Sequence, residues 1–112
     1  MTDKMKIITL CGSTRFAKDF LLIWKELNAK YYNTIVLLPD LYLSASERLA
    51  AQSDPELMNS LIEKHRIRID MADEVLVINK DGYIGETTKN EINYAMAKGI
   101  PIYYMEEKYY EC

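Results

Sequence analysis

The chain has 112 residues, a length that suits one compact domain over residues 1–112 and leaves no room for two. Hydrophobic residues make up 49% of it and charged residues 28%, which is the balance of an ordinary globular protein. The formal net charge is −3, and no run of lysine or arginine is longer than a pair. Binding to long DNA or RNA is therefore not expected, whereas a single small anion can still bind.

Sparse cysteines and the lack of a long apolar stretch exclude further classes of protein. Cys11 and Cys112 are too few for a disulfide framework, which favours a reducing cytoplasm. No apolar stretch is long enough to cross a membrane, and the opening MTDKMK has no apolar signal region behind its charges. His65 is the single histidine, so we expect no metal site, and no cofactor is expected.

The first part of the chain predicts two strands separated by a helix. Residues 6–12 (KIITLCG) are a short β-rich apolar run that stops at a glycine, and residues 34–39 (TIVLLP) are a second run that stops at a proline. Both runs are typical of buried strands. The helix between them has an apolar stripe at the helical period, formed by Phe16, Phe20, Ile23, Trp24 and Leu27.

A flap and a second helix are expected next. Residues 40–54 are mixed in character and predict a mobile flap with one short helix. Asp54, Pro55 and Glu56 then supply a cap, a proline at the first helical position and an acid in the first turn, which together indicate a helix start. Residues 74–79 (EVLVIN) predict the third strand. One face of the second helix carries Met58, Ile62, His65, Ile69 and Ala72.

The last part of the chain predicts a helix at residues 90–99 that ends at a glycine, and a fourth strand at residues 101–106. Strands that alternate with helices predict right-handed crossovers and a parallel sheet with helices on both faces. The strand runs are continuously apolar, as a doubly covered sheet requires. We therefore predict an α/β fold, a small doubly wound, flavodoxin- or Rossmann-like sheet of four strands in the order 2-1-3-4.

In such folds, ligands bind beyond the carboxyl ends of the strands, near the point where the strand order reverses. Here that point lies between the first and third strands. The segments that open there are Gly12 to Arg15, Asp40 and residues 79–88. Gly12 lets the chain turn and a ligand approach, and Ser13 or Thr14 can cap the first helix. Arg15 sits in the first turn, where the helix dipole disfavours a cation unless an anion binds beside it.

The residues of this first loop have two interpretations of about equal weight. One is a phosphate cradle, and the other is an ordinary strand-to-helix turn with a surface arginine. The loop matches neither the P-loop spacing nor the dinucleotide fingerprint, so an ATPase or a dinucleotide enzyme is disfavoured.

The stretch GETTKNEINYA also has two interpretations. Thr87 or Thr88 can cap the last helix, and Thr88 with Glu91 has the spacing of a capping box, which is the commoner arrangement. Alternatively, Glu91 borders the buried stripe of this helix and is a partly desolvated carboxylate fit to act as a nucleophile or base.

His65 is similarly ambiguous. It lies on the apolar stripe of its helix, which favours a core histidine with one hydrogen bond. A pKa near neutrality equally suits a general acid or a group that contacts a ligand. Two acids follow it near the end of the helix: Asp70 is expected to pair with Arg66 one turn back, and Asp73 either to act as a cap or to begin the third strand.

Three segments together resemble the nucleoside 2-deoxyribosyltransferase superfamily, including its nucleotide N-glycosidase branch. They are CGSTR after the first strand, the Ala-Asp pair of MADEVLV before the third, and GETTKNEINYA at the last helix. The resemblance covers nearly the whole chain. The resemblance implies that a glutamate of the last helix attacks the anomeric carbon of a nucleoside or nucleotide, and that water or a second base resolves the glycosyl-enzyme ester.

By this resemblance, Glu91 matches the nucleophile, and the turn from Gly12 to Arg15 matches the place where the nucleotide branch holds a 5′-phosphate. Gly85 and Thr87 match the loop along the sugar. The resemblance also implies a homodimer or larger homo-oligomer. One departure concerns His65, which occupies the position where the family usually has an aspartate that protonates or orients the leaving base.

Three hypotheses follow from the sequence. The first is an enzyme that cleaves or exchanges the N-glycosidic bond of a (deoxy)nucleoside 5′-monophosphate, with Glu91 as nucleophile and His65 facing the base. The second is a nucleotide-binding sensor or regulatory module without catalysis, which the histidine favours. The third is a domain that binds a protein partner. The hint for a partner is a set of tyrosines, a residue type enriched at interfaces: Tyr103, Tyr104, Tyr109 and Tyr110.

Overall fold

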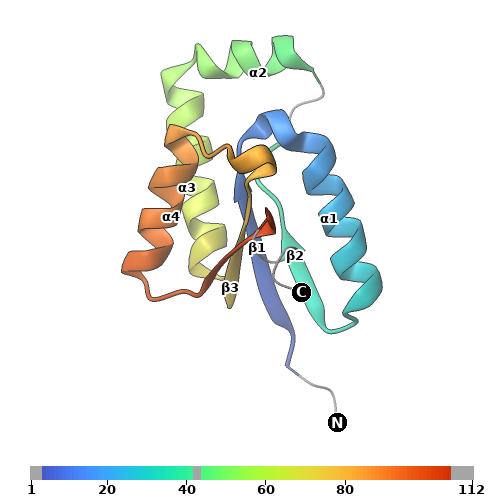
Figure 1. Ribbon diagram of the computed structural model, residues 1–112. Helices are drawn as coiled ribbons and strands as arrows, with labels where there is room; N and C mark the ends of the chain where they lie inside the picture. Colours follow the sequence, from blue (N-terminus) through green and yellow to red (C-terminus); the bar gives the residue numbers. More distant parts are fainter. Residues whose placement is uncertain (1–3, 42–43, 107–112) are drawn as a thin grey trace.

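A computed structural model describes residues 4–41 and 44–106 and confirms the predicted α/β architecture (Figure 1). Four parallel strands form one sheet in the order β2-β1-β3-β4, as the alternation of strands and helices predicts. Crossover connections in this order place the loops after β1 and β3 side by side at one edge. The strands are β1 (Lys6–Gly12), β2 (Thr34–Leu37), β3 (Glu74–Ile78) and β4 (Ile102–Tyr104).

Helices cover both faces of the sheet (Figure 1). α1 (Ala17–Lys30) lies on one face, and α3 (Pro55–Asp70) and α4 (Glu86–Ala97) lie on the other. α2 (Ala45–Gln52) is the short helix predicted in the flap, and it crosses above the carboxyl ends of the strands. Two short 3-10 helices, η1 (Thr14–Phe16) and η2 (Lys80–Gly82), follow β1 and β3. No helix in the described parts of the chain has the length and apolarity that a membrane crossing requires.

Two apolar clusters hold the helices to the sheet, one on each face. Alternate residues of β1 divide between them, because successive strand side chains point to opposite faces. Leu10 packs toward α1 with Phe20, whereas Cys11 packs toward α3 and α4 with Ile69 and Ile92. This alternation places the sulfur of Cys11 between the two helices that carry His65 and Glu91.

The predicted start of α3 is correct. Asp54 is its N-cap, and Oδ1 of Asp54 accepts a hydrogen bond of 3.1 Å from the backbone N–H of Leu57. Pro55 is the first helical residue, where its missing N–H has no intrahelical partner to lose. Asp73 at the other end of the helix pairs with the start of β1, since its Oδ2 accepts from the backbone N–H of Ile7 at 2.8 Å.

The predicted capping box at Thr88 and Glu91 is wrong. α4 begins at Glu86, four residues before the predicted start, and its N-cap is Gly85. Thr88 therefore lies inside the helix, where its side chain is 2% exposed, and Glu91 lies in the second turn. If Thr88 were the cap, it would lie outside the helix. Its burial against the protein core instead favours a position inside the helix. The helix does end at a glycine, Gly99, whose φ of 73° follows the last turn.

Two smaller predictions need correction. Trp24 is 43% exposed, so the buried stripe of α1 is narrower than its apolar pattern suggests. Asp70 does not pair with Arg66 as predicted. It forms an ion pair of 3.0 Å with Lys98 at the end of α4 and accepts a hydrogen bond from Tyr94. Tyr104 packs into the core and Tyr103 is exposed. Tyr109, Tyr110 and Cys112 lie outside the described residues.

Candidate functional site

A pocket of about 230 Å³ opens at the carboxyl ends of the strands, beneath α2 and between the loops that follow β1 and β3. Its position is the one expected for ligands of doubly wound sheets. The structure brings all the candidate site residues from the sequence to this single pocket. They are Gly12, Ser13, Thr14, Arg15, Asp40, His65, Gly85, Thr87 and Glu91.

The turn after β1 requires its glycine. Gly12 has a φ of 156°, and a Cβ added there would lie 2.9 Å from the carbonyl oxygen of Ile78 and 3.1 Å from the ring of Phe20. Ser13 caps the short η1 helix, since its Oγ accepts from the backbone N–H of Arg15 at 3.3 Å. α1 itself begins later, at Ala17, and has no side-chain cap. The predicted cap of α1 is therefore a cap of the turn that precedes it.

Arg15 connects the two loops of the pocket. Its guanidinium carbon lies 4.1 Å from the centroid of the Tyr83 ring, in a cation–π contact, and Phe16 packs edge-on against the same ring. In the described residues, no carboxylate forms an ion pair with Arg15. The positive charge is thus oriented at the pocket wall without being neutralised, which suits an anionic ligand.

Glu91 presents a half-buried carboxylate to the pocket. Loss of contact with water raises its pKa from the ordinary value of 4.5 to about 7, although a hydrogen bond with Cys11 acts in the opposite direction. A carboxylate with a pKa near 7 is partly ionised at neutral pH and is poorly solvated. Both properties favour nucleophilic or general-base chemistry.

His65 is held in one tautomer by its partners. Its Nε2 lies 3.0 Å from the carbonyl oxygen of Leu10, which can only accept, so Nε2 carries the hydrogen. Its Nδ1 lies 3.3 Å from Nη1 of Arg68, which can only donate, so Nδ1 is an acceptor. Burial and the charge of Arg68 lower the pKa of His65 to about 4. The ring is therefore neutral at physiological pH, and both nitrogens are occupied by the protein.

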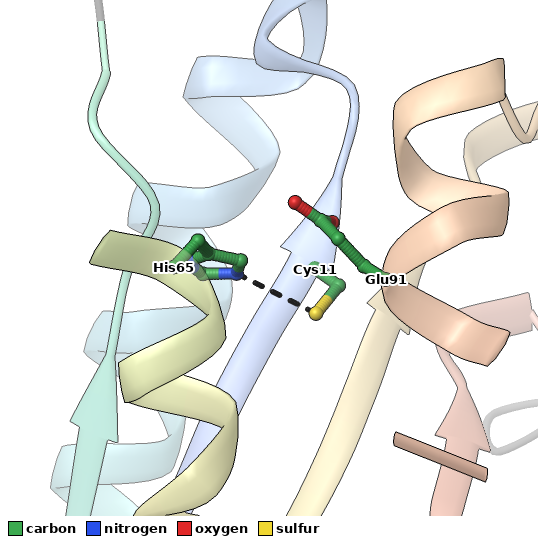
Figure 2. A group of neighbouring side chains, drawn as sticks. All are labelled: Cys11, His65 and Glu91. Carbon is green, nitrogen blue, oxygen red and sulfur yellow. Dashed lines mark hydrogen bonds between the residues drawn. The ribbon is translucent and has the colours of Figure 1, made fainter. Parts of the chain in front are cut away.

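Cys11 completes a cluster behind the pocket wall. Its side chain is fully buried, and its Sγ lies 3.5 Å from Nε2 of His65. Burial raises the pKa of Cys11 well above its ordinary value, and the neighbouring Glu91 raises it further. Figure 2 shows the three side chains brought together from α3, β1 and α4, with the hydrogen bond drawn between His65 and Cys11. No sequence pattern predicts this contact, because Cys11 stands there only as the end of an apolar strand.

The cluster has the residue types of a metal site, and one donor atom from each of Cys11, His65 and Glu91 lies within 4.8 Å of the others. The hydrogen bonds assign these atoms differently. A metal would need a lone pair on Nε2, but that nitrogen carries a hydrogen, and moving it to Nδ1 would oppose the Arg68 donor. His65 and Cys11 are instead joined by a hydrogen bond, and the carboxyl group of Glu91 lies beside them.

Asp40 is linked to His65 through the side chain of Arg68. Its Oδ2 lies 3.2 Å from Nη1 of Arg68, the same nitrogen that donates to His65. Asp40 also lines the pocket, so one carboxylate oxygen anchors the arginine while the group borders the ligand space. The loop after β2 is thereby joined to α3.

Sequence reasoning missed part of the pocket wall. An apolar surface is formed by Met58, Leu61 and Ile62 of α3, and Gln52 at the end of α2 adds an amide. Tyr83 also lines the pocket and lies against Arg15. Met58 and Ile62 belong to the predicted apolar stripe of this helix, so the sequence predicts that they are buried. It contains no signal that the stripe extends past the sheet into a ligand pocket.

The pocket thus has a charged end at Arg15, a half-buried carboxylate at Glu91, and an apolar wall on α3 that suits a planar ring. These features can hold an anion, a polar middle and an aromatic group of one ligand. No protein-family model, no curated protein and no solved structure matches the chain.

Proposed function

We propose that this protein cleaves or exchanges the N-glycosidic bond of a (deoxy)nucleoside 5′-monophosphate through a glycosyl ester on Glu91. The observation that carries the proposal is the half-buried carboxylate of Glu91, with a pKa near 7, in the same pocket as Arg15, which forms no ion pair with any residue that the structure describes. The resemblance of three sequence segments to nucleoside 2-deoxyribosyltransferases supports the same chemistry.

The first step forms one bond and breaks one. A carboxylate oxygen of Glu91 attacks the anomeric carbon, and the carbon–nitrogen bond breaks with its electron pair moving to the base. The base takes a proton from solvent or from a pocket group as it leaves. The product is a glycosyl ester of Glu91 that retains the 5′-phosphate.

In the second step, an acceptor attacks the same carbon and releases the Glu91 carboxylate. If the acceptor is water, its proton passes to solvent and a sugar phosphate is formed. If the acceptor is a second base, a new nucleotide is formed. Two displacements retain the configuration at the anomeric carbon, as in retaining glycosidases.

In this proposal, each part of the nucleotide is matched to pocket residues of suitable chemistry. The phosphate lies at the turn from Gly12 to Arg15, where backbone, hydroxyl and guanidinium donors meet. The sugar lies along Gly85 and Thr87, and the base packs against the apolar wall of α3. Since both nitrogens of His65 are engaged, the imidazole offers the base a neutral ring surface and supplies no proton at neutral pH.

The second candidate is a nucleotide-binding module of the same fold without catalysis. The observation that favours it is also at His65, because a neutral, fully engaged imidazole stands where the related enzymes usually have an aspartate. Such a module would be stabilised by a nucleotide and would release no base.

The resemblance also supports a homodimer or larger assembly, and the sparse cysteines support a location in the cytoplasm. Leu21, Leu22 and Trp24 of α1 are exposed, which is favourable for contact with another copy. Sedimentation equilibrium at micromolar concentration tests this directly, since a monomeric mass would contradict it.

The test of function is the release of free base from a panel of ribo- and deoxyribonucleoside 5′-monophosphates. The parent chain should release base from at least one, and Glu91→Gln should not. Glu86→Gln is a matched control, because Glu86 lines the same pocket on the same helix but is exposed. Loss of release in Glu86→Gln alone would move the nucleophile to that residue. Nucleotide-induced stabilisation without release would favour the binding module.

A further inference from the structure

We propose that Thr88 is a further substrate-contacting residue: its buried hydroxyl binds the 2′-hydroxyl of a ribose, so the site prefers ribonucleoside to 2′-deoxyribonucleoside 5′-monophosphates. The inference deepens the proposed function and rests on it, because the sugar is located relative to the carboxylate of Glu91. Thr88 takes no part in the contacts proposed above for the phosphate, the sugar and the base.

The hydroxyl of Thr88 is buried without a protein partner. The side chain is 2% exposed, and no hydrogen bond joins its hydroxyl to any residue that the structure describes. Thr9 is also fully buried, but its Oγ1 donates to the backbone carbonyl of Arg68 at 2.7 Å. A buried hydroxyl that lacks a partner is costly, so Thr88 is suited to a partner that comes from a ligand.

Thr88 borders the ligand space in spite of its burial. It lines the pocket together with Glu91, which follows three residues later on α4. Residues three apart on a helix lie on the same side, with about 5–6 Å between their Cβ atoms. Ile92 and Ala95 continue this side of the helix into the core. The pocket is therefore the space from which a ligand can reach the hydroxyl of Thr88.

The stereochemistry of a nucleotide brings its 2′-hydroxyl toward Thr88. In a natural nucleoside, a displacement brings the nucleophile to the face of the sugar opposite the base. The 2′-hydroxyl of a ribose lies on that same face, on the carbon next to the one that Glu91 attacks. The 3′-hydroxyl is one carbon farther away and is present in both sugars. The neighbour of Glu91 on α4 therefore meets the position at which ribose and deoxyribose differ.

The hydrogen bonds that this contact requires are consistent with one another. Each hydroxyl can donate and accept, so Thr88 can donate to the 2′ oxygen while the 2′ hydrogen points toward Glu91. In retaining glycosidases, hydrogen bonds to the 2-hydroxyl strengthen in the transition state. A deoxyribose places a methylene group against Thr88 and leaves its hydroxyl unpaired. A site built around a substrate hydroxyl rejects an analogue that lacks it.

The test compares the parent with Thr88→Val, which removes the hydroxyl and keeps the shape, and with Thr88→Ser, which keeps the hydroxyl. In each protein, kcat/KM is measured for a ribonucleoside and a 2′-deoxyribonucleoside 5′-monophosphate of the same base. The ratio of ribose to deoxyribose should fall by about 10- to 100-fold in Thr88→Val and stay near the parent value in Thr88→Ser. Comparison of this ratio between proteins cancels the different intrinsic reactivity of the two sugars. An unchanged ratio in Thr88→Val would overturn the inference and leave the proposed function standing.

Binding measurements separate the inference from catalysis. In Glu91→Gln, where no turnover is expected, isothermal titration should find the ribonucleotide bound about 10- to 100-fold more tightly than the deoxyribonucleotide. Adding Thr88→Val should remove this preference. If it does so while the parent releases no base from any monophosphate, the proposed function fails and the contact of Thr88 stands. Equal affinities for the two nucleotides in Glu91→Gln would contradict the contact.

Thermal unfolding shows whether the variants are intact. Thr9→Val loses a hydrogen bond and should have a lower Tm than the parent, whereas Thr88→Val loses none and should not. A fall in the Tm of Thr88→Val as large as that of Thr9→Val would show that a protein group already pairs with the hydroxyl, and this result would overturn the proposal.

Discussion

The guanidinium of Arg15 lies over the ring of Tyr83, with 4.1 Å between its central carbon and the ring centroid. This contact joins the loop after β1 to the loop after β3, and both residues line the pocket. It holds a positive charge in place before any ligand arrives, which reduces the ordering that phosphate binding would require.

Replacement of Arg15 by alanine should weaken the binding of a nucleoside 5′-monophosphate by about 10- to 100-fold, because a charge-assisted hydrogen bond is lost. Binding of the corresponding nucleoside, which has no phosphate, should change little. Isothermal titration with both ligands separates the two effects. Lys18→Ala is the control, since Lys18 is an exposed cation three residues away outside the pocket lining. Equal losses for nucleoside and nucleotide would remove Arg15 from the phosphate site.

Glu91→Gln should make the protein inactive and more stable. The native Glu91 keeps its proton up to about pH 7, whereas the unfolded chain releases it near 4.5. Between these values the native state binds more protons, so the free energy of unfolding falls as the pH rises. The amide removes a penalty of up to about 3 kcal/mol above pH 7 and none below pH 4.5. Urea unfolding at pH 4 and pH 8 checks this, and a gain that is equal at both pH values would contradict it.

His65 should have the opposite effect on how the free energy of unfolding depends on pH. Its pKa is lowered from 6.5 to about 4, so the unfolded chain binds a proton between these values and the native state does not. The free energy of unfolding should therefore rise with pH over that range and offset much of the fall caused by Glu91. Glutamine at position 65 can still donate to Leu10 and accept from Arg68 without titrating. In His65→Gln the fall with pH should become visible, and an unchanged pH profile would count against a neutral buried His65.

Gly12→Ala should destabilise the fold by about 3 kcal/mol and abolish nucleotide binding, because the new Cβ meets the Ile78 carbonyl at 2.9 Å in an unfavourable backbone conformation. Gly99→Ala is the matched control. Gly99 also has a positive φ, but no heavy atom lies within 4 Å of an added Cβ, so about 1 kcal/mol is expected. Similar losses at the two positions in thermal unfolding would show that close packing at Gly12 is unimportant.

Removal of metal ions should leave base release unchanged. Nε2 of His65 carries a hydrogen and is directed at the Leu10 carbonyl, so the cluster with Cys11 and Glu91 does not present three lone pairs to a cation. Activity measured before and after dialysis against excess chelator decides the point. A loss of activity that zinc restores would show that the cluster rearranges to bind a metal.

Much of the fold and the place of the site follow from the sequence. The strands and the start of α3 at Asp54 and Pro55 are predicted from local sequence patterns, and the structure confirms both predictions. Once the sheet is parallel and doubly wound, the turn at Gly12 and the carboxylate at Glu91 must approach each other. Their meeting in one pocket is therefore a consequence of topology.

The start of α4 and the environment of Glu91 do not follow from local patterns. Gly85, Thr87 and Thr88 are all acceptable caps, and in the structure the cap is Gly85 while Thr88 is buried inside the helix. Cys11 and His65 are 54 residues apart, and their contact depends on how α3 is rotated on the sheet. The rotation of a packed helix is set by many small contacts, which no single motif encodes.

The most direct test of the central claim is a search for the glycosyl ester on Glu91. The protein is mixed with its best 5′-monophosphate substrate, quenched in acid, digested and analysed by peptide mass spectrometry. A peptide containing Glu91 should gain the mass of the sugar phosphate, and the gain should be absent in Glu91→Gln. Base release by the parent chain with no modified peptide, or with the modification on another residue, would contradict Glu91 as the nucleophile.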